Sequence, residues 1–97
     1  MYARIASFEG GDNDRLQQLN EERMQSGQME APDGMKRAMV LADKDGNRRL
    51  FVTFFDSREQ VDAAEEGFDR MGDTIPEDVR GRRTSVDVYE VMFDRSA

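Results

Sequence analysis

The 97-residue sequence contains no cysteine, no histidine and no tryptophan. Without cysteine, the chain cannot form a disulfide, a thiolate nucleophile, an iron–sulfur cluster or a thiolate zinc site. Without histidine, it has no imidazole base, no histidine-ligated haem and no ordinary zinc or copper site. We therefore predict that the protein uses no metal and no cofactor, and most familiar catalytic arrangements are excluded.

Positive charge is also scarce. The chain has 14 lysine and arginine residues against 21 aspartate and glutamate residues, which gives a formal net charge of -7. Nucleic acids and anionic membranes attract proteins with clustered positive charge, so both are disfavoured as partners. No apolar run reaches the roughly 18 residues of a membrane span, and residues 1–11 lack the apolar stretch of a signal peptide. We expect a cytoplasmic protein.

The pattern of apolar residues predicts a series of strands and helices. Period-two segments bounded by turn residues predict strands at Tyr2–Phe8, Lys36–Ala42, Arg49–Phe55 and Ser85–Phe93. Helices are predicted from Asp12 to Gly27 and from Ser57 to Gly72. No repeat or low-complexity tract divides the chain, so we expect a single domain over residues 1–97. The order is that of an α+β, ferredoxin-like βαββαβ fold with a four-stranded antiparallel sheet.

The clearest local signals belong to the central hairpin and the second helix. Asp45-Gly46 favours a tight turn, because glycine accepts positive φ and aspartate is among the residues that tolerate it. Symmetrical pairing about this turn places Leu41 opposite Leu50 and Met39 opposite Val52. The second helix begins with the capping box Ser57-Arg58-Glu59-Gln60, and its apolar residues recur on one helical face.

Two short helices cover only one side of a four-stranded sheet, so the other side needs a partner. We assign the row of Met39, Leu41, Leu50, Val52 and Phe54 to the helix side, together with Ala3 and Ile5. The opposite side then carries most of the aromatic residues, with Tyr2, Arg4, Phe8, Phe51, Thr53, Phe55, Asp87 and Tyr89. Because such a patch marks an interaction site, we predict a homodimer in which two sheets close an α+β barrel.

The order of elements, the segment Phe54–Gln60 and the terminal segment Val86–Val91 resemble the dimeric α+β barrel proteins of the antibiotic biosynthesis monooxygenase type. The resemblance covers nearly the whole chain. Members of that superfamily include cofactor-independent monooxygenases that act on aromatic or quinol-like substrates, haem-degrading enzymes and isomerases. The resemblance implies a homodimer that binds a small aromatic or amphipathic molecule in an apolar cavity. If the protein is an enzyme, it implies a cofactor-independent, monooxygenase-like oxidoreductase.

Six residues are candidates for lining that cavity: Arg4, Phe51, Thr53, Phe55, Asp87 and Tyr89. A cation, a phenol and aromatic walls suit a small planar or acidic ligand. In a catalytic role, Arg4 would stabilise a developing anion and Tyr89 would donate a hydrogen bond. The alternative is that Arg4 and Asp87 lie on adjacent strands and pair inside the dimer interface, where Tyr89 also packs.

Two other functions stay open at this point. The protein could be a non-catalytic assembly or accessory module whose barrel is filled by side chains. It could also be an RNA-recognition-motif-like module, which shares the βαββαβ order and carries aromatic residues on its third strand, as Phe51 would here. Against that reading, Arg4 and Arg49 stand at positions where the motif places aromatic residues for base stacking.

Overall fold

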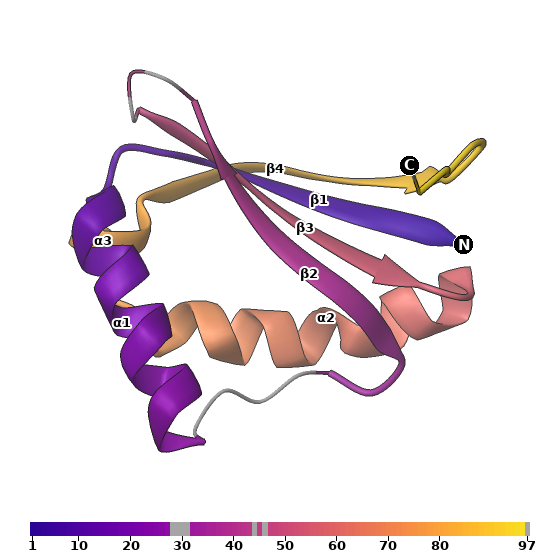
Figure 1. Ribbon diagram of the computed structural model, residues 1–97, viewed down its shortest axis with the longest axis horizontal. Helices are drawn as coiled ribbons and strands as arrows, with labels where there is room; N and C mark the ends of the chain where they lie inside the picture. Colours follow the sequence, from indigo (N-terminus) through magenta and orange to yellow (C-terminus); the bar gives the residue numbers. More distant parts are fainter. Residues whose placement is uncertain (28–31, 44, 46, 97) are drawn as a thin grey trace.

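The computed structural model describes residues 1–27, 32–43, 45 and 47–96. Its elements are β1 (Tyr2–Glu9), α1 (Asn13–Ser26), β2 (Met35–Ala42), β3 (Arg48–Phe55), α2 (Arg58–Asp73), α3 (Glu77–Arg80) and β4 (Arg82–Glu90). The strands pair antiparallel in the order β2-β3-β1-β4, and the helices lie on one side of the sheet (Figure 1). The α+β, ferredoxin-like βαββαβ prediction is therefore confirmed, and α3 is an additional short turn.

The helix ends follow local capping chemistry. In α1, an Asp12 carboxylate oxygen accepts a hydrogen bond from the backbone N–H of Arg15 at 3.1 Å, and Gly27 caps the other end with φ of 73°. In α2, the predicted capping box of Ser57 and Gln60 is present. The predicted stop at Gly72 is wrong, because Gly72 does not take the positive φ of a C-terminal cap and Thr74 ends the helix instead.

The strand register agrees with the symmetrical hairpin. Leu41 lies opposite Leu50 and Met39 lies opposite Val52, as predicted, although Gly46 of the expected turn lies outside the described residues. The last strand begins earlier and ends earlier than predicted. It pairs along the whole of β1 and ends at Glu90, which lies opposite Tyr2. Only Met1 precedes Tyr2, so β1 offers little backbone for further pairing.

The apolar core lies between α2 and the sheet. Phe68 of α2 packs edge-on against Phe51 and Phe55 of β3, with ring centroids 6.0 and 6.1 Å apart. The predicted face assignment of β1 and of the hairpin is therefore wrong. Arg4, Phe51, Thr53 and Phe55 lie on the helix side, whereas Ile5, Leu50, Val52 and Phe54 lie on the other side.

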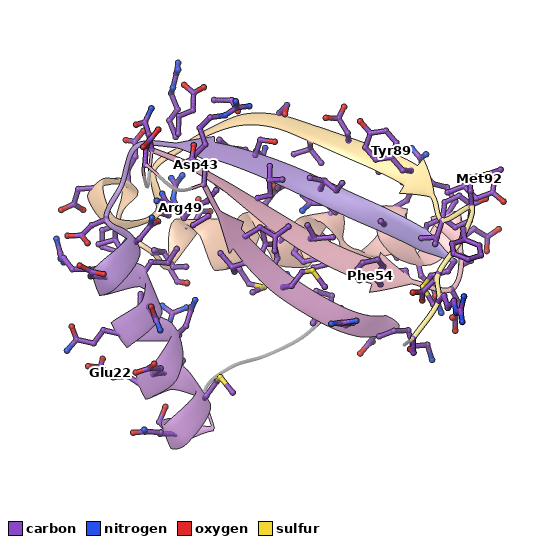
Figure 2. All side chains as sticks on the ribbon, turned by 45° about the horizontal axis from the view of Figure 1, so that its top comes forward. Glu22, Asp43, Arg49, Phe54, Tyr89 and Met92 are labelled. Atoms are coloured by element: carbon purple, nitrogen blue, oxygen red, sulfur yellow. The ribbon has the colours of Figure 1, made fainter. Side chains whose placement is uncertain are left out.

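The sheet face away from the helices is still apolar, but it is mainly aliphatic. By register it carries Ile5, Met39, Leu41, Leu50, Val52, Phe54 and Tyr89. Leu41 is 46% exposed and Tyr89 is 56% exposed, and Figure 2 shows Tyr89 projecting from β4 on the side away from α2. We call these seven residues the open face. Asp87 and Tyr89 lie on this side, as predicted.

We expect Phe55→Ala to lower the free energy of unfolding by about 3–5 kcal/mol, because the ring is fully buried and its loss leaves a cavity. The matched control is Phe93→Ala, which removes a ring that is 81% exposed and should change stability by less than about 0.5 kcal/mol. Urea denaturation measures both. If both variants lowered the free energy of unfolding equally, the observed orientation of β3 would be contradicted.

Candidate functional site

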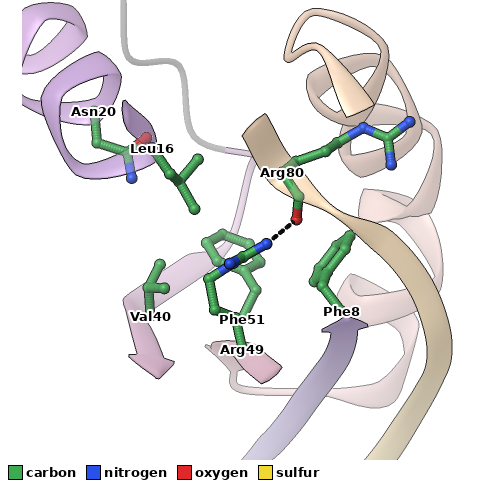
Figure 3. A pocket seen from close by; sticks show the side chains of 7 residues that line it. All are labelled: Phe8, Leu16, Asn20, Val40, Arg49, Phe51 and Arg80. Carbon is green, nitrogen blue, oxygen red and sulfur yellow. Dashed lines mark hydrogen bonds between the residues drawn. The ribbon is translucent and has the colours of Figure 1, made fainter. Parts of the chain in front are cut away.

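A cavity of about 100 Å³ lies between α1 and the helix side of the sheet (Figure 3). Seven residues line it: Phe8 of β1, Leu16 and Asn20 of α1, Val40 of β2, Arg49 and Phe51 of β3, and Arg80 of α3. The cavity exists because α1 covers this end of the sheet without filling it. None of the α1 residues is fully buried, whereas α2 buries Val61, Ala64 and Phe68.

Arg49 is the charged residue at the base of this cavity, and it is only 2% exposed. One terminal nitrogen, Nη1, donates to the side-chain oxygen of Asn13 at 2.5 Å. The other, Nη2, donates to the carbonyl oxygens of Gly10 and Arg80, each at 2.5 Å. Its Nε is buried without a hydrogen-bond partner among the described residues. The guanidinium thus ties together the start of α1 and the end of α3.

Among the described residues, no carboxylate forms an ion pair with Arg49. Burial lowers the pKa of the Arg49 guanidinium, and the negative charge of Asp12 partly opposes this shift. Asp12 also caps α1. Arginine keeps its proton in proteins, so Arg49 is a buried cation that is solvated mainly by neutral oxygens.

Two glycines make room for the guanidinium. Gly11 and Gly81 have positive φ angles of 84° and 82°, which disfavour other residues. A Cβ atom at either position would also collide with Nη2 of Arg49. The turn between β1 and α1 and the turn between α3 and β4 therefore hold Arg49 by close backbone approach.

The six residues predicted to line a cavity do not gather in one place. Phe51 lines the cavity described above, and Phe55 and Thr53 are buried beneath α2. The Thr53 hydroxyl has no hydrogen-bond partner among the described residues. Asp87 and Tyr89 lie on the opposite side of the sheet, because they alternate with the inward-facing Val88.

Arg4 is a structural residue of the core. Its Nε donates to one carboxylate oxygen of Glu65 at 2.6 Å and its Nη2 donates to the other at 3.1 Å. Its guanidinium lies over the ring of Phe68, 4.2 Å from the centroid. The expected pairing with Asp87 is wrong, because Arg4 lies opposite Val88 and Asp87 lies opposite Ile5 on the other face.

Sequence reasoning missed Arg49 as a site residue. In the sequence, Arg49 is noted only because it replaces an aromatic residue of the RNA-recognition motif. A signal was available, since Arg49 continues the alternation of Phe51, Thr53 and Phe55 and therefore shares their face. A charged residue in an otherwise inward-facing apolar row is typical of a buried polar site.

Two classes of feature are not found in the described part of the chain. No helix there is long and apolar enough to cross a membrane. Among the same residues, no group of three or more aspartate or glutamate side chains is arranged to hold a metal ion.

Comparison with solved structures assigns the fold. The chain is similar to a protein described as a candidate antibiotic biosynthesis monooxygenase from Chloroflexus aurantiacus, with a TM-score of 0.62 and 15% identity over 98% of this chain and 96% of that one. It is also similar to the monooxygenase ActVA-Orf6 of Streptomyces coelicolor, in complex with nanaomycin D, with a TM-score of 0.58 and 15% identity over 99% and 88% of the two chains.

A third similar structure is a variant of MhuD with two manganese protoporphyrin IX molecules bound per active site. Its TM-score is 0.61 at 17% identity, and both chains are covered completely. No protein-family profile and no curated protein sequence matches the chain. The protein therefore has the fold of antibiotic biosynthesis monooxygenase-like proteins over its whole length, as the sequence resemblance predicted.

We expect Gly11→Ala to destabilise the protein at least about 1 kcal/mol more than Gly10→Ala, since overpacking typically costs about 1–3 kcal/mol. Both glycines have positive φ, so both variants share the backbone strain. An added Cβ at position 11 would meet the Arg49 guanidinium and the backbone of Val79 and Gly81, whereas at position 10 it would meet nothing within 4 Å. Urea denaturation compares the two. If Gly10→Ala is equally costly, the absence of a side chain at Gly11 is not what permits this close packing.

Proposed function

We propose that this protein binds a small aromatic or amphipathic molecule in the cavity between α1 and the sheet. The observation that carries the proposal is the composition of the wall. Phe8, Leu16, Val40 and Phe51 supply apolar surface, and Asn20 and Arg49 supply the polar side chains. Ligand sites typically combine a mostly apolar lining with a few polar groups that fix orientation.

The similar proteins support this proposal. One of them is seen with nanaomycin D and another with two manganese protoporphyrin IX molecules, so the same fold holds small-molecule ligands in those proteins. In this chain, the weakly buried α1 forms one wall of the cavity, which lets the cavity admit a molecule without unfolding the α2 core. We propose that residues 1–97 act as one such binding domain in the cytoplasm.

A second candidate function is monooxygenase-like turnover of the bound molecule, which is favoured by the fold shared with ActVA-Orf6. The chain has no histidine or cysteine, so substrate and oxygen would supply the chemistry and the protein would bind and orient them. Arg49 would face the substrate in that case, in place of the Arg4 and Tyr89 pair expected from the sequence.

The alternatives receive less support. A filled accessory module would not need the cavity beneath α1. In an RNA-recognition motif the aromatic residues stack bases on the exposed sheet, but Phe51 packs against Phe68 under the helices.

We also propose that the protein is a homodimer joined through the open face. Leu41 and Tyr89 are large residues that stand exposed beside Ile5, Met39 and Phe54. If two copies of the chain pack these patches against each other, a single two-fold interface buries both patches.

The dimer proposal predicts a solution mass near twice 11.1 kDa. We expect Leu41→Lys to halve that mass, because a desolvated ammonium opposes the contact. Met24→Lys is the matched control, since Met24 is exposed on α1 and far from the open face. Light scattering on a sizing column measures all three proteins. A wild-type mass of one chain would exclude the dimer.

The binding proposal predicts that Leu16→Trp lowers affinity for indole by about tenfold or more, because the larger side chain fills the cavity. Met24→Trp places the same residue on an exposed position of the same helix and should leave affinity unchanged. Chemical shift changes at the backbone amides of Phe8 and Phe51 report the binding. Unchanged indole binding by Leu16→Trp would show that the cavity is not the site.

A further inference from the structure

The cavity has a charge that nothing in its wall neutralises. Its seven lining residues include two arginines and no acid. Among the described residues, Arg49 bonds to the side chain of Asn13 and to backbone carbonyls. Arg80 contributes its backbone side to the wall, and Figure 3 shows its guanidinium directed away from the other lining residues, where it donates through Nε to Ile75 at 3.2 Å and through Nη1 to Gly81 at 3.0 Å. Neither arginine takes part in an ion pair of the described residues.

Arg4 and Arg49 are the buried basic side chains of the described residues, and Arg4 is paired with Glu65 whereas Arg49 has no ion pair there. Six basic residues of the described segments have carboxylate partners within 4 Å: Arg4, Arg15, Lys36, Arg58, Arg82 and Arg83. The acid whose charge acts on Arg49 is Asp12, and its side chain accepts the cap hydrogen bond of α1. Arg49 is thus a buried cation with no carboxylate partner among the described residues.

A second observation concerns the donor that Arg49 leaves unused. Its Nε–H is buried and has no acceptor among the described residues, and an unmade hydrogen bond of a buried charged group is costly. Charge-assisted hydrogen bonds are roughly twice as strong as neutral ones, and Coulomb attraction increases as water is excluded. An anionic oxygen in the cavity would therefore gain more from this site than a neutral oxygen would.

We propose that the cavity selects a small molecule that combines an apolar body with one negatively charged oxygen, as in an aromatic carboxylate. The apolar body lies against Phe8, Leu16 and Phe51, and the anionic oxygen lies on the side of Arg49. This inference rests on the binding function proposed above and adds to it the charge of the ligand.

The experiment compares benzoate with benzamide, which have the same shape and differ in charge. We expect benzoate to bind about tenfold more tightly, because a hydrogen bond to a charged group adds about 1.4 kcal/mol over a neutral one. The preference should weaken at high salt. Titration followed by the chemical shifts of cavity-lining amides gives both dissociation constants.

Two variants each remove one positive charge. Arg49→Gln should reduce the preference for benzoate while benzamide still binds. Arg82→Gln is the matched control, because Arg82 is exposed, pairs with Glu9 and does not line the cavity. It should keep the full preference. If Arg49→Gln does not fold, the salt dependence of the wild-type protein decides, and a benzoate preference that does not weaken at high salt would overturn the inference.

The outcomes separate the two proposals. Equal affinity for benzoate and benzamide would overturn the charge inference and leave the binding function standing. A preference that Arg82→Gln abolishes as fully as Arg49→Gln would overturn it too, because the effect would then be one of net charge. If benzoate, benzamide and indole all fail to bind, the proposed function and this inference are both wrong.

Discussion

The contact between Phe68 and the sheet orients everything else in this protein. Phe68 meets the rings of Phe51 and Phe55 edge-on, and the Arg4 guanidinium lies over its face. Because side chains alternate along a strand, placing these two rings under α2 also turns Arg49 to the same side. A shift of β3 by one residue would send the whole row to the opposite face. The charged cavity thus depends on an aromatic contact made at the other end of the same strand.

The two buried arginines are accommodated in different ways. Burying a cation is costly unless it is paired or well hydrogen-bonded. Arg4 is paired with Glu65, so its charge is neutralised locally and it helps to fasten α2 to β1. Arg49 is held by an amide and by carbonyl oxygens, which stabilise the cation without cancelling its charge. Its field therefore remains available to whatever enters the cavity.

The arrangement of strands and helices in this fold does not determine which ligand is bound. Structures with identities of 15–17% to this chain share its arrangement of strands and helices, and they are seen with ligands as different as nanaomycin D and metalloporphyrins. A fold does not by itself specify a function. In this protein we propose that the wall residues Leu16, Val40, Phe51 and Arg49 carry the chemical selectivity.

Local chemistry in the sequence determined the order of elements, the hairpin register of Leu41 with Leu50, and the cap at Ser57, because turn residues and caps act over a few positions. The tertiary structure alone decided which face of the sheet is covered, where β4 ends, and that Arg49 and Arg80 meet at one cavity. Alternation along a strand is symmetric between its two faces, so the choice between them is made only when α2 packs. That packing joins residues far apart in the chain, and no local pattern encodes it.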